Sequence, residues 1–292
     1  MVKTLKIACV LIFLCKMTFA NDSLSIKKSN KKLYYLVGSE AMTYTAGYIG
    51  LSYLWYSGFP RSSFHLFNDQ KEWLQMDKFG HCFSTYWIAR SNFKLLQWAD
   101  ASDNVALWGG IASSWLFIST IEVFDGFSAE YGASPEDILA NTTGATIFGL
   151  QQYFWKEQKI LYKMSYFPSQ YAKLRPNELG TTPIERLLKD YNGQTYWFST
   201  GIRAFTGINA IPDWLNLAVG YGAHGMTGAS DNKGIIPESE RARQFYLSFD
   251  INLEKIKTKN KLLRSIFFTL NCLKFPLPAI QFNKFNTKLL IR

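Results

Sequence analysis

The chain has 292 residues and a net charge of +10, and 48% of its residues are hydrophobic and 16% aromatic. Two of its four cysteines lie within the first 20 residues, and Cys82 and Cys272 alone are too few for a disulfide scaffold, so a packed hydrophobic core must hold the fold. Basic chains often bind nucleic acid, but no motif for such binding is recognisable here, and we predict no nucleic-acid partner.

Residues 1–20 have the layout of a cleavable secretory signal, with a basic start, an apolar run from Ile7 to Leu14 and a small-residue cleavage site. Lys16 interrupts this run well before the about 20 apolar residues that a membrane span needs. Cys15 follows a bulky leucine where a lipoprotein signal has a small residue, which argues against lipidation. We therefore predict export, with residues 1–20 as the signal peptide and the polar, lysine-rich residues 21–32 as a flexible leader.

Four long apolar segments come next, and each is predicted to be a helix. They cover residues 33–56, 75–98, 105–127 and 134–155. The last has the clearest start, because Ser134 supplies an N-cap that is followed by a proline and two acidic residues. Short links between long helices predict an antiparallel bundle, and the first and third helices are apolar almost all round, which favours membrane association.

The composition changes after residue 158. Basic, proline-bearing and glycine-rich stretches replace the long apolar helices, and we expect a short helix at Pro183–Tyr191, a strand at Phe245–Leu253 and a further helix at Lys261–Cys272. The predicted fold class is therefore mainly α: an antiparallel bundle of four apolar helices over residues 33–158, with residues 159–292 as a peripheral mixed region.

Polar side chains recur at helical spacing within three of the four helices. On a helix, residues three or four apart share one face, so each of these helices carries polar groups on one side. If the three sides face one another, the bundle encloses a polar centre. Its predicted members are Asp77, Lys78, His81, Glu122, Asp125, Asp137 and Asn141.

This predicted centre admits several roles. In a structural role, Lys78 neutralises Glu122 or Asp125 while Asn141 completes a hydrogen-bonded network, because buried charges must be paired. Recognition of a small or lipid headgroup ligand is another role that such a pocket allows.

A divalent metal site and acid/base catalysis are the sharper alternatives. Imidazole and carboxylate groups are metal ligands, although one histidine is few for zinc and the paired Glu-x-x-His motifs of di-iron bundles are missing. No other cofactor is predicted. The candidate metal ligands are Asp77, His81 and Glu122, and the candidate catalytic groups are His81, Glu122 and Asp125.

Three motifs in order, Asp77-Lys-Phe-Gly-His81, Glu122-Val-Phe-Asp125-Gly and Ser134-Pro-Glu-Asp-Ile-Leu-Ala-Asn141-Thr-Thr-Gly144, resemble a known family. It is the YfiM-like predicted periplasmic lipoproteins (domain of unknown function 2279), whose function is unknown. More distantly, the motifs are similar to those of VanZ-like membrane proteins. The resemblance covers about residues 60–155 and implies a fold, a location and a shared polar centre rather than an activity.

These observations predict an exported, periplasmic cell-envelope protein, associated with the membrane, whose polar centre binds a small or lipid headgroup ligand or is structural. The expected partner is a membrane lipid or another envelope component. The alternative is a metal-assisted or acid/base hydrolase that acts on an envelope lipid or a cell-wall precursor.

Overall fold

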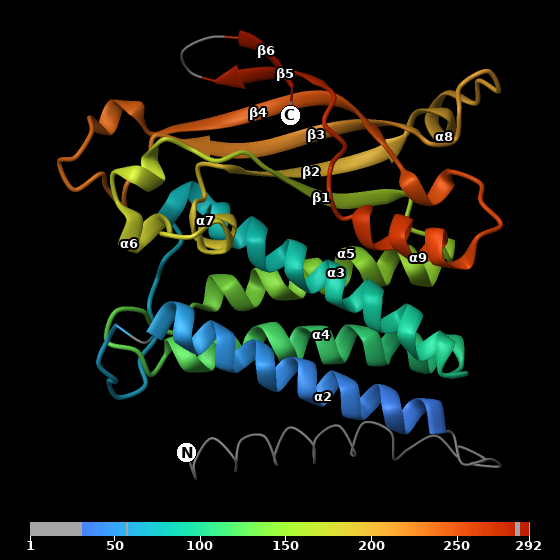
Figure 1. The fold of residues 1–292 in the computed structure, drawn as a ribbon, viewed down its shortest axis with the longest axis horizontal. Helices are drawn as coiled ribbons and strands as arrows, with labels where there is room; N and C mark the ends of the chain where they lie inside the picture. Colours follow the sequence, from blue (N-terminus) through green and yellow to red (C-terminus); the bar gives the residue numbers. More distant parts are fainter. Residues whose placement is uncertain (1–30, 57, 284–286, 292) are drawn as a thin grey trace.

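A layer of long helices lies against an antiparallel β-sheet (Figure 1). The computed structural model describes residues 31–56, 58–283 and 287–291, so the predicted signal peptide lies outside the described residues, as does nearly all of the predicted leader. The long helices are α2 (Lys31–Leu51), α3 (Met76–Trp98), α4 (Asp103–Asp125) and α5 (Pro135–Trp155). A π-helical turn, η1 (Ser52–Tyr56), continues α2.

Helix starts follow the capping residues in the sequence. The Ser102 side chain accepts a hydrogen bond from the Val105 N–H and caps α4, and the Ser134 side chain accepts one from the Asp137 N–H and caps α5. A proline at the first position and two acidic residues in the first turn add to the α5 start. These caps satisfy backbone donors that have no partner within the helix.

Glycines allow α3 to pack closely between α4 and α5. A Cβ atom added at Gly110 of α4 would lie 2.7 Å from the Ala89 carbonyl oxygen, and one added at Gly144 of α5 would lie 2.2 Å from the Cys82 carbonyl oxygen. Both distances are far below van der Waals contact. Only glycine therefore permits these two close approaches, and they fix the spacing of the three helices that carry the predicted polar centre.

The second layer is a six-stranded meander with the order β1-β2-β3-β4-β5-β6. Its strands are β1 (Ile160–Tyr166), β2 (Gln194–Gly201), β3 (Leu215–His224), β4 (Ala242–Ile251), β5 (Pro278–Asn283) and β6 (Thr287–Ile291). Short helices connect them: α6 (Pro176–Leu179), α7 (Pro183–Lys189), α8 (Ile202–Thr206) and α9 (Lys261–Leu270). The 3-10 turns are η2 (Glu72–Gln75), η3 (Tyr171–Lys173), η4 (Glu238–Glu240) and η5 (Leu253–Lys255).

The main hydrophobic core lies between α3 and the first strands of the sheet. The Trp87 indole N–H donates to the Tyr162 carbonyl oxygen at 2.5 Å, and the Tyr162 hydroxyl donates to the Phe79 carbonyl oxygen at 3.0 Å. Tyr86 and Tyr196 are buried in the same cluster. The aromatic residues of helix and sheet thus form one core.

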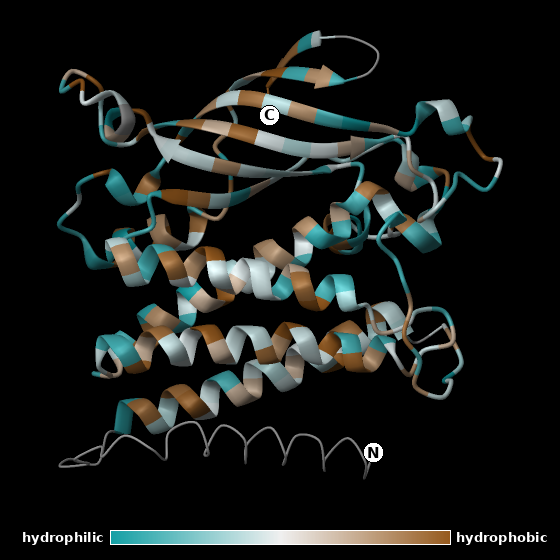
Figure 2. Ribbon diagram, turned by 180° about the vertical axis from the view of Figure 1, so that it is seen from behind, coloured by the Kyte–Doolittle hydropathy of each residue, from teal (hydrophilic) through white to brown (hydrophobic). Residues whose placement is uncertain are grey.

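The two faces of the sheet differ in character, and apolar and polar residues alternate along its strands (Figure 2). The face that packs on α3 is apolar, and the same face is exposed farther along the sheet, as at Val219 of β3. The opposite face buries Trp197 and a fully buried ion pair, in which the Lys163 Nζ lies 2.8 Å from an Asp250 carboxylate oxygen. Gly220 lies across from Trp197, where a Cβ atom would be 2.6 Å from the indole ring.

The structure corrects the predicted fold class. The helices lie close to their predicted positions, but the protein is not a mainly α, VanZ-like four-helix bundle with a peripheral C-terminal region, and that prediction is wrong. It is a mixed α/β protein, because β1 to β6 form a continuous sheet that shares its core with α3. The division of the chain at residue 158 stays a prediction.

Among the described residues, α4 is the helix that is long and apolar enough to cross a membrane. A core helix passes the same test of length and composition. Membrane association therefore stays a prediction at this point.

Candidate functional site

Three helices bring their polar residues to the same end of the helical layer. Asp77, Lys78 and His81 lie in the first turns of α3, Asp137 and Asn141 lie in the first turns of α5, and Glu122 and Asp125 lie in the last turn of α4. The antiparallel course of α4 places its end beside the starts of the other two. Six of the seven predicted residues meet around the His81 and Lys78 side chains.

The His81 imidazole lies in the middle of this group. Its Nδ1–H donates to the Asn141 Oδ1 at 3.0 Å, and the Asn141 amide donates in turn to the Ser119 hydroxyl at 3.2 Å. This pairing directs Nε2 toward three carboxylates. Nε2 lies 3.8 Å from Asp77 Oδ1, 3.8 Å from Glu122 Oε1 and 3.9 Å from Asp137 Oδ1. These distances are too long for direct hydrogen bonds.

Fixed partners hold two of the three carboxylates in place. The Tyr191 hydroxyl donates to Asp77 Oδ1 at 2.7 Å, and the Ser134 backbone N–H donates to Glu122 Oε2 at 3.0 Å. The second oxygen of Glu122, Oε1, is buried and has no hydrogen-bond partner among the described residues. An unsatisfied buried carboxylate oxygen costs free energy, so this atom is available to a proton, a further donor or a cation.

Lys78 neutralises one side of the centre. Its Nζ lies 2.5 Å from Asp69 Oδ2, 2.7 Å from Asp137 Oδ1 and 3.2 Å from Asp77 Oδ2. The contact with Asp137 is an ion pair that is not aligned as a hydrogen bond. Burial alone would lower the pKa of Lys78, but Asp77 and Asp137 outweigh it and raise that pKa. Lys78 is therefore a permanent cation.

Negative groups outnumber positive ones at the centre. The carboxyls of Asp77, Glu122 and Asp137 surround His81, while Lys78 is shared with Asp69. Burial raises the pKa of Glu122 to about 7 and that of Asp137 to about 8. Burial lowers the pKa of His81, but the three carboxylates outweigh it and raise the value to about 9. The centre thus holds bound protons near neutral pH.

Asp125 is the predicted residue that the structure sets apart from His81. Its Oδ1 accepts a hydrogen bond of 2.6 Å from the Tyr56 hydroxyl, and burial raises its pKa to about 6. Asp125 therefore ties the end of η1 to α4. Among the described residues, no hydrogen bond or ion pair joins Asp125 to His81.

Sequence reasoning missed several members of the centre. Asp69 precedes α3 and accepts a hydrogen bond of 2.7 Å from the Ser134 hydroxyl, and Tyr191 follows α7 in the region predicted to be peripheral. Asp69 lies in a link and Tyr191 is the last residue of a short predicted helix, and no pattern pointed to either as a partner of the centre. Ser134 was predicted as a helix cap and is confirmed as one, and it also fixes Glu122 and Asp69.

The side chains around Nε2 can hold a cation. Ligand atoms of Asp77, His81 and Asp137 all lie within 4.8 Å of one another, and Glu122 Oε1 lies 3.8 Å from His81 Nε2. The Glu122 and Asp137 side chains are 4% and 5% exposed, whereas those of His81 and Asp77 are 16% and 24% exposed. The Glu122 and Asp137 sides of the centre are therefore buried, and the Asp77 and His81 side chains are partly exposed.

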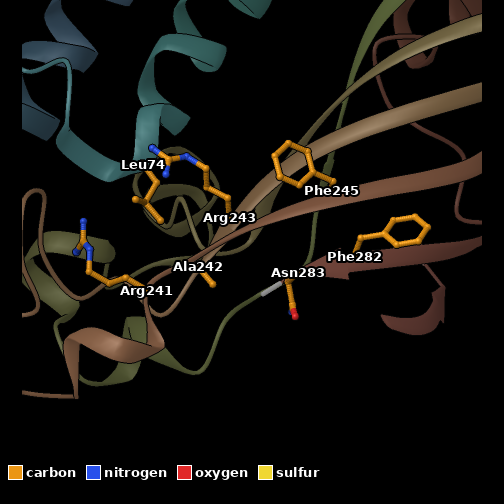
Figure 3. Close-up of a pocket in the computed structure, with 7 residues that line it drawn as sticks. All are labelled: Leu74, Arg241, Ala242, Arg243, Phe245, Phe282 and Asn283. Carbon is orange, nitrogen blue, oxygen red and sulfur yellow. The ribbon is translucent and has the colours of Figure 1, made fainter. Parts of the chain in front are cut away.

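Two surface hollows lie elsewhere. One, of about 560 Å³, is lined by the approach to α3 and by β4 and β5, with Leu74, Arg243, Phe245 and Phe282 around it (Figure 3). The other, of about 380 Å³, lies on the last turns of α5. Neither contains a residue of the polar centre, so the centre is not the floor of either hollow.

Comparison with protein families gives one match. Residues 65–153 match the model of a family described as predicted periplasmic lipoprotein, DUF2279, which confirms the resemblance to that family over this segment. The VanZ-like resemblance has no such support. Comparison with curated proteins and with solved structures gave no match. The matched segment contains the seven predicted residues and agrees with a periplasmic location.

Proposed function

We propose that this protein is an exported envelope protein whose polar centre binds one divalent metal ion. Glu122 Oε1 carries the proposal: it is buried and unpartnered, and it lies 3.8 Å from the ring nitrogen of His81 that has no hydrogen bond. A carboxylate oxygen and an imidazole lone pair that face each other across a gap repel one another unless a proton or a cation lies between them.

The dimensions suit an ion of the first transition series. Metal–ligand bonds of roughly 2.0–2.2 Å separate neighbouring ligand atoms by about 3.4 Å in a tetrahedral site. The three separations from Nε2 are 3.8, 3.8 and 3.9 Å, each about half an ångström longer than this spacing. One imidazole with three carboxylates suits Mn²⁺, Fe²⁺ or Zn²⁺.

Two neighbours support this role without touching the proposed ion. Metal-binding histidines usually donate their other ring N–H to a fixed acceptor, and Asn141 is that acceptor here at 3.0 Å. Tyr191 fixes Asp77 in the same way. Lys78 shares Asp137 with the proposed ion and limits the excess negative charge.

A metal-assisted hydrolase is the second candidate, favoured by the partial exposure of the Asp77 side chain. A bound ion would supply a Lewis acid that activates water there. Neither hollow adjoins this position, which supports a small substrate group or a purely structural ion over a large buried substrate. A centre stabilised by Lys78 alone is the structural alternative.

Calorimetric titration of the chelator-treated protein with Zn²⁺ and Mn²⁺ tests the proposal. We expect one ion per chain, and we expect Glu122→Gln and His81→Ala to weaken binding at least tenfold. Glu40→Gln is the matched control, because it removes a partly buried carboxylate of α2 that also has an unpartnered oxygen.

Full affinity in Glu122→Gln, or no stoichiometric binding by the wild type, would contradict the proposal. If the wild type binds no stoichiometric metal and its thermal stability is unchanged by chelation, the structural alternative, a centre stabilised by Lys78 alone, is favoured.

A further inference from the structure

Helix α9 turns an apolar stripe toward solvent. Leu262, Ile266 and Leu270 follow one another at helical spacing and are 70%, 42% and 46% exposed. Phe268, on another side of the helix, holds α9 to α3: its ring lies 5.9 Å from that of Trp87 and 3.7 Å from the Lys94 ammonium. The helix is thus fixed to the protein while its apolar stripe stays outside.

Unpaired cations flank the start of this stripe. Lys257, Lys259, Lys261 and Arg264 are exposed, and none of them forms an ion pair within the part of the chain that the structure describes. The first turn of α9 contains no acidic residue. The positive end of the helix dipole therefore adds to the lysines, and nearby negative charge would stabilise this arrangement.

The last turn of α5 extends the same surface. Lys255, at the start of the lysine-rich loop, pairs with Glu157 at 3.3 Å and thereby joins the loop to the end of α5. Trp155 is 47% exposed there, and the Lys159 ammonium lies 5.1 Å from its ring centre. Tryptophan beside lysine is typical of side chains that lie at a membrane–water interface.

We infer that α9 and the loop from Lys255 to Lys261 dock on the surface of an anionic lipid bilayer. The stripe lies among the acyl chains at the headgroup boundary, and the lysines contact lipid phosphates. The single sign of the flanking charge favours a bilayer over a second copy of this chain, because a second copy would bring the same positive charge to the contact. This inference is independent of the proposed metal centre.

Co-sedimentation of the full-length protein with vesicles tests the inference. We expect binding to vesicles of phosphatidylglycerol and phosphatidylcholine and little binding to phosphatidylcholine alone. Replacement of Lys257, Lys259 and Lys261 by glutamate should weaken binding roughly a hundredfold. The control replaces Lys71, Lys173 and Lys288, which are exposed elsewhere, and makes the same change in net charge.

Ile266→Glu should also weaken vesicle binding at least tenfold, whereas Ile184→Glu, at an exposed position of α7, should not. Circular dichroism checks that each variant is folded. Equal losses in the two lysine variants, or full binding by Ile266→Glu, would overturn the inference. So would a dimer in vesicle-free solution that Ile266→Glu dissociates, because a second copy would then cover the stripe.

Discussion

The close approach of α5 to α3 at Gly144 makes the sharpest prediction about stability. In Gly144→Ala the new Cβ atom would lie 2.2 Å from the Cys82 carbonyl oxygen and 2.9 Å from its carbonyl carbon. Both neighbours are backbone atoms of a helix and cannot rotate away. The two helices must therefore separate by about 1 Å to restore normal contact.

The cost follows from two effects. Overpacking of this kind costs about 1–3 kcal/mol, and alanine returns at most about 1 kcal/mol of helix propensity. Asn141 lies one turn before Gly144, so separation also stretches its 3.0 Å hydrogen bond with His81, which is worth about 1 kcal/mol. We expect a net loss of about 2 kcal/mol in the free energy of unfolding, and a Tm lower by roughly 4–8 °C.

Thermal unfolding followed by circular dichroism measures this change. Gly50→Ala in α2 is the matched control, because its Cβ atom would meet nothing within 4 Å. That variant should be more stable than the wild type by up to about 1 kcal/mol. If Gly144→Ala were stabilised as much as Gly50→Ala, α3 and α5 would not pack as described.

Three further variants test other parts of the structure. Burial raises the pKa of Glu40 to about 7 from its usual 4.5, so the unfolded chain ionises first and stability falls as the pH rises through that interval. Glu40→Gln should remove this fall. Because the group is partly exposed, we expect the free energy of unfolding to rise by about 1–2 kcal/mol at pH 8, as measured by unfolding across a range of pH. Lys163→Met should lose about 3–5 kcal/mol in urea unfolding because it leaves Asp250 buried and unpaired, and adding Asp250→Leu should recover part of the loss. Ser134→Ala should lose about 1–2 kcal/mol in the same assay, since it removes the α5 cap; an unchanged midpoint would contradict the capping role.

The sequence predicted the long helices well because their signals are local. The segment 75–98 is observed as Met76–Trp98, and the segment 134–155 is observed as Pro135–Trp155. Caps and apolar length mark both segments without information from the rest of the chain.

Most of the sheet was not predicted, because its strands bury polar side chains where strands ordinarily bury apolar ones. Strand β2 buries polar side chains such as Gln194 and Ser199, and β3 contains Gly220, which strands ordinarily avoid. Gly220 is explained only by Trp197 on the neighbouring strand, which is a contact that no local pattern records. Only the strand predicted at Phe245–Leu253 was recognised, and it is observed as Ala242–Ile251.

The sequence predicted those residues of the candidate centre that lie on helices. Spacing on α3, α4 and α5 brought His81 together with Glu122 and Asn141, because faces of packed helices meet. Asp69 and Tyr191 come from connecting segments, and their positions depend on the tertiary fold. The roles of all these residues in binding stay proposals.

Anomalous diffraction from crystals grown with Zn²⁺ or Mn²⁺ tests the proposed metal centre most directly. We expect a peak at the metal edge within about 2.2 Å of both His81 Nε2 and Glu122 Oε1, with the Asn141 hydrogen bond to Nδ1 intact. A map without a peak there, in which Nε2 instead donates directly to a carboxylate oxygen, would contradict it.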